Sequence, residues 1–276
     1  MSLPLPSTLS PSKISAFKHC PLAFRFSVID GLPEPPSPAA SKGTLVHRAL
    51  ELLMVRPPAQ RSLEAALADL DRARSELADD PEFSGLDLTD EERDAFHADA
   101  AELVRRYFQL EDPATVRPIG LELKMSIQVG GLTLRGIIDR LELDTDGGLV
   151  VTDYKTGSAP REGFEQDRLG GVHFYSLLCE RLLGRRPATI QLMYLSTPEV
   201  LYTTPTENSV TATERRAVAL FAAVERACQR EDFRPNRGRL CDWCSFQAYC
   251  PAWGGDPARA VELREALAAT TTFVTP

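Results

Sequence analysis

Apolar and polar residues alternate with a period of two in the middle of the chain, and the flanking segments follow a helical period. The alternating segments are Ile119–Val129, Leu132–Leu143 and Leu149–Lys155, separated by turn sequences at Gly130-Gly131 and Asp144–Gly148. This pattern predicts three half-buried strands in an antiparallel meander. Because the buried face of a meander must be covered, we expect helices to pack on it.

The helices are predicted from the spacing of apolar residues and from the residues that begin and end them. Ser10-Pro11 is typical of a helix start, and that helix is expected to end near Cys20. Gly31–Ala40 is rich in proline and is expected to be a loop. Further helices are expected at 43–56, 62–78, 89–110, 164–183, 211–230 and 257–268, and further strands at 189–195 and 200–204.

These elements predict an α/β fold with a central mixed sheet that contains the antiparallel meander and is flanked by helices. The length of 276 residues fits a single domain with a helical insertion at about 59–112 and a core at about 41–56 and 117–230. Cys20 together with 234–252 is expected to form a separate metal-binding region.

Composition and charge limit the cellular setting and the kinds of partner. The start of the chain has no basic segment followed by an apolar one, and no apolar run reaches about 20 residues. We therefore expect a cytoplasmic protein without a membrane segment, in which clustered cysteines bind metal rather than form disulfides. The net charge of −8 argues against a surface covered with nucleic-acid contacts, but it allows a local basic patch.

Two acids and a lysine are predicted at neighbouring strand ends. Asp153 and Lys155 are two residues apart on one strand, so their side chains share a face, and the preceding turn brings Asp139 towards Asp153. Two adjacent carboxylates repel each other unless a cation such as Mg²⁺ or Mn²⁺ neutralises them. With a lysine beside it, such a site suits metal-assisted phosphodiester hydrolysis. The alternative is an ordinary surface salt bridge between these residues.

Three motifs together resemble a known enzyme family. They are G-x-x-x-H-x-x-L-E at 43–51, G-x-x-D at 136–139 and D-Y-K-T-G at 153–157. Their order and separation are similar to those of the RecB/Cas4-like branch of the PD-(D/E)XK nuclease superfamily, which includes AddB-like proteins. The resemblance covers almost the whole chain. It implies a restriction-endonuclease-like core and a metal-dependent DNA nuclease, with exonuclease action on single strands as the expected activity.

The resemblance also implies roles for individual residues. His47, Asp139, Asp153 and the carbonyl of Tyr154 would be metal ligands, and Lys155 would be the catalytic lysine. An imidazole ligand shifts the preference from Mg²⁺ towards Mn²⁺. A lone histidine beside an apolar stripe can equally be a core residue, which is the alternative for His47.

One family motif is incomplete in this chain. Family members commonly carry Q-x-x-x-Y on the helix after the catalytic lysine. Tyr175 matches the tyrosine, but Gly171 stands at the glutamine position. The resemblance gives Tyr175 a role in catalysis, whereas packing is the alternative; the missing glutamine can change the rate or the substrate.

Four cysteines are candidates for a second metal centre. Cys241, Cys244 and Cys250 form C-x2-C-x5-C, and Cys20 is the natural fourth ligand. Spacing alone allows either zinc or a [4Fe–4S] cluster. One distant cysteine followed by a C-terminal triplet is similar to iron–sulfur nucleases, so the resemblance favours the cluster. Basic and aromatic residues that suit single-stranded DNA, or packing around the cluster, lie nearby: Arg234, Arg237, Arg239, Trp243, Phe246 and Tyr249.

These observations leave three functional hypotheses. The first is a nuclease in DNA repair or processing. The second is a catalytically weak or inactive iron–sulfur DNA-binding subunit of a helicase–nuclease assembly. The third is a zinc-containing protein-interaction element on an unrelated α/β protein. The chain contains no G-x-x-x-x-G-K-[ST] motif, so unwinding of a duplex would require a helicase partner.

Overall fold

The computed structural model describes residues 3–161, 163 and 165–272, except for the side chains of 165–170 and 268–272. The chain divides into two compact units, each of which is discontinuous in sequence. Unit 1 comprises Met1–Pro35, Gln128–Arg135 and Glu214–Pro276, and unit 2 comprises Pro36–Ile127 and Gly136–Thr213. The expectation that the chain is a single domain stays a prediction.

The sheet is mixed, as expected for a restriction-endonuclease-like core. Its strands are β1 (Thr8–Leu9), β2 (Pro118–Val129), β3 (Leu132–Leu143), β4 (Leu149–Lys155), β5 (Thr189–Tyr194) and β6 (Glu199–Thr203). They follow the order β1-β3-β4-β5-β6, and β2 also pairs with β3. β3 and β4 are antiparallel, β4 and β5 are parallel, and β5 and β6 are antiparallel. The predicted meander of β2, β3 and β4 is therefore confirmed.

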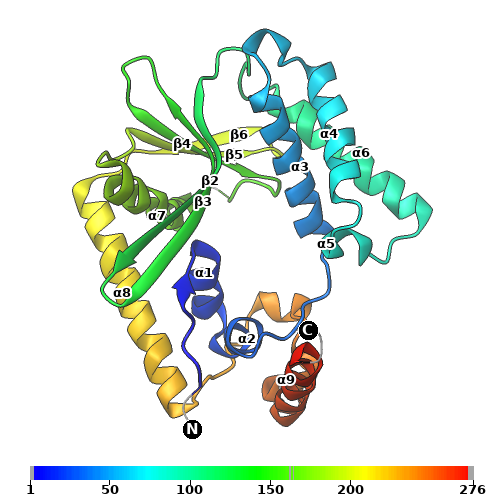
Figure 1. Ribbon diagram of the computed structural model, residues 1–276, viewed down its shortest axis with the longest axis vertical. Coiled ribbons are helices and arrows are strands. Elements are labelled where there is room, and N and C mark those ends of the chain that lie inside the picture. Colours follow the sequence, from blue (N-terminus) through cyan, green and yellow to red (C-terminus); the bar gives the residue numbers. More distant parts are fainter. Residues whose placement is uncertain (1–2, 162, 164, 273–276) are drawn as a thin grey trace. The chain divides into compact units, whose positions relative to one another are not determined.

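Three long helices of unit 2 pack side by side on the sheet (Figure 1). They are α3 (Pro38–Val55), α4 (Leu63–Leu77) and α6 (Asp90–Tyr107), with the single turn α5 (Pro81–Ser84) between the last two. Their buried faces share one core with residues of β4 and β5, which includes Val46, Leu53, Ala100, Val104, Tyr154 and Met193. A further helix, α7 (Glu165–Leu183), follows β4 and contacts β5 and β6.

Some predicted helix boundaries shift by a few residues. α3 begins at Pro38, which shortens the predicted loop; proline is well tolerated in the first turn of a helix, and the Ser37 side chain before it makes no capping hydrogen bond. α6 begins at a complete capping box between Thr89 and Glu92 and ends at Tyr107 rather than 110. β1 and α5 were not predicted, and residue 164, the expected first residue of α7, lies outside the described residues.

Unit 1 holds the remaining helices. They are α1 (Pro11–His19), α2 (Pro21–Phe24), a π-helical turn (Arg25–Ile29), most of α8 (Glu207–Arg230) and α9 (Pro257–Thr272), with three short 3₁₀ segments: Arg239–Trp243, Gln247–Tyr249 and Pro251–Trp253. Asp30 is buried between Arg25 and Arg264, each at 3.1 Å, which ties α9 to the π-helical turn. In the described part of the chain, no helix is both long enough and apolar enough to span a bilayer.

Candidate active site

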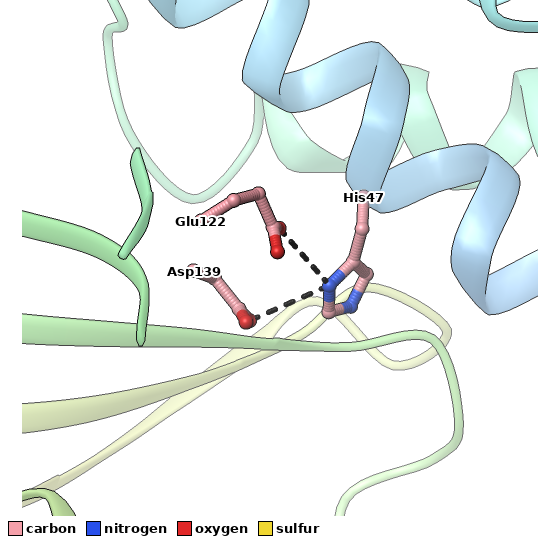
Figure 2. Close-up of side chains that lie close together, drawn as sticks. All are labelled: His47, Glu122 and Asp139. Carbon is pink, nitrogen blue, oxygen red and sulfur yellow. Dashed lines mark ion pairs between the residues drawn. The ribbon is translucent and has the colours of Figure 1, made fainter. Parts of the chain in front are cut away.

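An imidazole and two carboxylates from three different elements of unit 2 meet at one point (Figure 2). His47 comes from α3, Glu122 from β2 and Asp139 from β3. His47 Nδ1 lies 3.5 Å from Asp139 Oδ2 and 4.0 Å from Glu122 Oε1. One ligand atom from each of the three residues lies within 4.8 Å of the others, and no other trio of His, Cys, Asp or Glu among the described residues does so. This group is therefore a candidate metal centre.

The partners of the His47 ring favour its metal-binding form. Nε2 lies 3.0 Å from the carbonyl oxygen of Tyr154, and a carbonyl can only accept a hydrogen bond. The proton is thus assigned to Nε2, which leaves the lone pair of Nδ1 directed towards the two carboxylates. Burial lowers the pKa of His47 below its usual value, so the neutral imidazole that a metal requires is favoured.

The carboxylates carry negative charge that the nearby side chains only partly offset. Burial, and next the charge of Asp153, raise the pKa of Asp139 well above its usual value, although the backbone N–H of Tyr154 donates to Asp139 Oδ2 at 2.7 Å. Burial, and next the charge of Glu51, raise the pKa of Glu122. A bound cation would remove the electrostatic penalty of ionising both groups. The donor set therefore fits a hard divalent cation that accepts one imidazole.

Asp153, Lys155 and Tyr175 form a second group next to this one. Lys155 Nζ makes a close ion pair with Asp153 Oδ2, and the Tyr175 hydroxyl donates to Asp153 Oδ1 at 3.2 Å. Burial is the largest single influence and lowers the pKa of Lys155, but the charge and hydrogen bond of Asp153, together with the nearby Asp139, raise the pKa above its usual value. Lys155 is therefore a cation, suited to holding a negatively charged group rather than to removing a proton.

A glycine on β3 lets α7 approach closely enough to bring Tyr175 to Asp153. A Cβ atom at Gly136 would lie 2.8 Å from the Leu178 side chain and 3.4 Å from the Tyr175 ring, so a larger residue there would require the Leu178 side chain to move. Gly171, one helical turn before Tyr175, is exposed, and a Cβ atom added to it would have no other atom within 4 Å. The space that the first side-chain atom of the glutamine in Q-x-x-x-Y would fill is therefore open at Gly171.

The Tyr154 side chain lies on the other face of β4 from Asp153 and Lys155, as alternation along a strand requires. Its hydroxyl accepts a hydrogen bond of 2.9 Å from Arg140, which is fully buried. Arg140 also makes a bidentate pair with Glu111, to which Tyr107 donates a further hydrogen bond. The peptide groups of Tyr154 bind Asp139 and His47, so this buried network fixes the strand that carries the candidate site.

Glu122 is the one member of the group that the sequence reasoning missed. It occupies a polar position in an alternating strand, where a solvated side chain is the ordinary expectation. The turn between β2 and β3 is the signal that identifies it. A two-residue turn at Gly130-Gly131 pairs residue 129 with residue 132, and continuing this antiparallel pairing back along both strands places Glu122 opposite Asp139. Glu122 also has a φ of 42°, in the left-handed region that residues other than glycine avoid. Such strain is common at functional sites.

The predicted site residues are thus found together: His47, Asp139, Asp153, Tyr154, Lys155 and Tyr175 lie within one connected set of contacts in unit 2. Their individual roles stay predictions.

The four candidate cluster ligands also lie together, in unit 1. Cys20, Cys241, Cys244 and Cys250 line a single cavity of about 390 Å³. Backbone N–H groups of Asn236 and Gly238 donate to the sulfur atoms of Cys20 and Cys241 at 3.5 and 3.4 Å. Burial raises the pKa of the Cys244 thiol, and the other three cysteines contribute in the same direction.

Comparisons with known proteins agree with this geometry. The model of the PD-(D/E)XK nuclease superfamily matches residues 8–251, a range that contains the carboxylate–imidazole group, Lys155 and the four cysteines. Gene 69 protein of Mycobacterium phage D29 is 28% identical over 185 residues, which are 60% of this chain and 67% of that protein. The crystal structure of a candidate exonuclease from Eubacterium rectale has the same fold, with a TM-score of 0.53 at 15% identity over 86% of this chain and 87% of that one. The mixed sheet flanked by helices is the restriction-endonuclease-like fold, and the chain belongs to the PD-(D/E)XK nuclease superfamily.

Proposed function

We propose that this nuclease is a divalent-metal-dependent exonuclease that hydrolyses DNA phosphodiester bonds and prefers single strands. The observation that carries the proposal is the meeting of His47, Glu122 and Asp139 next to the Asp153–Lys155 pair. These residues come from α3, β2, β3 and β4, so an accidental cluster on one surface element does not explain their convergence.

In this proposal the metal ligands are His47, Asp139 and Asp153, joined by Glu122; the carbonyl of Tyr154 would join them by exchanging its hydrogen bond from His47 Nε2 for the metal. When bound, a divalent cation would supply charge stabilisation at the phosphoryl group and make water a better nucleophile at neutral pH. The neutral imidazole favours Mn²⁺ over Mg²⁺ because it is softer than an oxygen ligand. The three carboxylates remain compatible with either ion.

The other residues of the site act on charge and orientation. Lys155 holds its positive charge beside Asp153 and can pair with an oxygen of the scissile phosphate. Tyr175 orients the Asp153 carboxylate through its hydrogen bond of 3.2 Å. The Tyr154 amide orients Asp139 in the same way at 2.7 Å. These contacts hold the acids in place before substrate binds.

We also propose that the four cysteines bind a [4Fe–4S] cluster. Zinc–sulfur bonds of about 2.3 Å in a tetrahedron would hold the sulfur atoms roughly 3.8 Å apart, but no three cysteine sulfurs of the described residues lie within 4.8 Å of one another. A cluster spreads its ligands over different iron atoms and needs more space, which suits the cavity of about 390 Å³. Backbone N–H groups directed at the sulfur atoms suit either zinc or a cluster. The distances between the sulfur atoms are therefore the stronger support for the cluster.

The exonuclease and single-strand parts of the proposal have weaker support. The similar fold from Eubacterium rectale is described as a candidate exonuclease. Without a helicase motif, this chain would act on ends that are already unpaired, or with a helicase partner in DNA repair or processing. A catalytically weak DNA-binding subunit is the second candidate, and the open position at Gly171 is the observation that favours it.

The test is cleavage by protein purified without oxygen. With Mn²⁺ and end-labelled single strands, we expect shortened products from the native protein and none from Asp139→Asn or Lys155→Gln. Asp146→Asn, an exposed carboxylate in the loop between β3 and β4, is the matched control and should cleave normally. Equal cleavage by all four proteins would show that a contaminating nuclease is responsible. DNA binding without cleavage by the native protein would favour the second candidate.

A further inference from the structure

The aromatic residues near the four cysteines differ sharply in exposure. Phe246 is buried, and its ring centroid lies 5.6 Å from that of Phe26; Tyr249 packs against the same ring at 6.0 Å. Phe246 therefore belongs to the interior of unit 1, and Tyr249 is half-buried against it. Trp243, by contrast, is 84% exposed. Trp243 is also more exposed than Trp253, which lines the same cavity and is 47% exposed.

Trp243 lies on a short segment between two of the four cysteines. It ends the 3₁₀ segment Arg239–Trp243, whose other large apolar residue, Leu240, is 59% exposed. The flanking residues Cys241 and Cys244 both line the cysteine cavity, so the backbone on each side of the indole is tied to the candidate cluster. Residues three apart in a 3₁₀ segment lie on one face, so Leu240 and Trp243 together form an exposed apolar patch of the kind that marks a binding surface.

The arginines near Trp243 also differ from one another. Arg234 pairs with Asp232 at 3.0 Å, which neutralises its charge. The guanidinium of Arg237 lies 5.6 Å from the ring centre of Trp253, a cation–π contact that leaves its charge in place. Arg237 and Arg239 line the same cavity as Trp243. Two arginines therefore accompany Trp243, and neither makes an ion pair among the described contacts, although Glu34 lines the same cavity.

The charge of the chain is divided unevenly between its units. Unit 1 contains 13 lysines and arginines against 10 acidic residues, a net charge of +3. Unit 2 contains 18 against 29, a net charge of −11. A polyanion is therefore attracted to unit 1 despite the overall charge of −8.

We propose that Trp243 stacks on an unpaired base of single-stranded DNA, with Arg237 and Arg239 contacting the adjacent phosphates. The proposal deepens the proposed nuclease function and rests on it for the identity of the strand as DNA. Stacking requires a free base face, which a strand offers and the interior of a duplex does not. A protein partner would need a wider apolar surface than one indole and Leu240 between two cations. The surface thus selects strands by pairing state rather than by sequence.

The first experiment measures binding without cleavage. Anisotropy of a labelled thymidine oligomer is recorded in the presence of a metal chelator, with a closed dumbbell duplex in parallel. Because stacking contributes roughly 1–3 kcal/mol per base, Trp243→Ala should weaken strand binding by about 5- to 150-fold and leave dumbbell binding unchanged. Trp243→Phe should retain most of the affinity. Tyr202→Ala removes a 61% exposed aromatic from unit 2 and is the matched control, with no expected loss.

Two further measurements do not depend on a substitution at Trp243. The chain has two tryptophans, so Trp253→Phe leaves Trp243 as the only one, and its fluorescence should be quenched as the strand saturates the protein. The logarithm of the binding constant falls linearly with the logarithm of the salt concentration. Arg239→Gln should make this slope shallower by about 0.7, the value expected for the loss of one phosphate contact on a single strand. Arg234→Gln, which removes an arginine paired with Asp232, is the control and should change the slope less.

The outcomes separate this proposal from the nuclease proposal. Unchanged strand binding by Trp243→Ala, an equal loss for strand and dumbbell, or no quenching at saturation would overturn the stacking site. Tighter binding of an RNA oligomer than of DNA would overturn DNA as the occupant. Because binding is measured without metal, Trp243-dependent binding by a protein that never cleaves would refute the nuclease proposal alone.

Discussion

The guanidinium of Arg140 donates a hydrogen bond of 2.9 Å to the hydroxyl of Tyr154, and both residues are neighbours in sequence of candidate metal ligands. Arg140 follows Asp139, and Tyr154 follows Asp153. Because side chains alternate along a strand, the ligands lie on one face while their neighbours form a buried polar network on the other. The network is connected to the helical insertion through Glu111 and Tyr107.

The pair of Arg140 and Glu111 gives the first prediction. Glu111→Gln removes the main counter-charge of a fully buried arginine, so we expect a loss of unfolding free energy of about 3 kcal/mol in urea titration. Glu111→Gln combined with Arg140→Met removes both charges and should recover much of that loss. If the losses of the two single variants simply add in the double variant, the two residues do not act as a pair.

The strained backbone of Glu122 gives the second prediction. Glu122→Gly should relieve the left-handed conformation, and with it roughly 1–2 kcal/mol of backbone strain, while it removes a carboxylate from the candidate metal centre. We therefore expect weaker Mn²⁺ binding in calorimetry, by roughly tenfold or more, without a loss of thermal stability. Glu122→Gln should show the weaker binding alone. Glu199→Gln, on the exposed end of β6, serves as the control, and equal Mn²⁺ affinity in all variants would exclude Glu122 as a ligand.

The open position at Gly171 gives the third prediction. Gly171→Gln and Gly171→Ala should both stabilise α7 by up to about 1 kcal/mol because glycine is a poor helix former. Only the glutamine restores Q-x-x-x-Y, so only this variant should cleave single strands faster than the native protein. A rate increase of the same size in the alanine variant would assign the effect to helix stability.

The hydroxyl of Tyr175 gives the fourth prediction. Tyr175→Phe removes its hydrogen bond to Asp153 but keeps the ring that packs against Gly136. One hydrogen bond of ordinary strength corresponds to about 1 kcal/mol, so kcat should fall by roughly fivefold while the melting temperature stays within a few degrees. A melting temperature that falls without any change in kcat would make Tyr175 a packing residue.

The cysteines give the fifth prediction. Cys250→Ser should remove the broad visible absorbance of an iron–sulfur protein and lower the unfolding free energy, because a link between Cys20 and the C-terminal triplet closes a loop of about 220 residues worth roughly 5 kcal/mol. Cys179→Ala, at a buried cysteine outside the cavity, should keep the absorbance. A colourless native protein that contains zinc after anaerobic purification would contradict the cluster.

The strands were predictable because their signals are local. Leu132–Leu143 and Leu149–Lys155 have the same bounds in sequence and structure, since alternation and glycine-containing turns define both ends. β1 has two residues, which is too short for any period, and it exists only because Thr8 and Leu9 pair with Thr133 and Leu134. The early start of α8 was readable in principle, because Thr206 and Ser209 cap each other's backbone N–H groups.

The candidate site was predictable in part for a different reason. Asp153 and Lys155 share a face by strand geometry, whereas His47 could be joined to them only through the resemblance of motifs, since 106 residues separate it from Asp153. Glu122 was missed because its position looks solvated. The choice of Trp243 among several aromatic residues required exposure values, which depend on tertiary packing.

The division of the chain has a consequence for biosynthesis. Unit 1 is assembled from three separated segments, and the last of them begins at Glu214. All of unit 2 has been synthesised once the nascent chain reaches Thr213. Unit 2 can therefore fold during translation before the C-terminal segment of unit 1, which packs with the N-terminal segment that contains Cys20, has been made. A nascent chain stalled before residue 241 should therefore contain a folded unit 2 but only Cys20 of the four candidate cluster ligands.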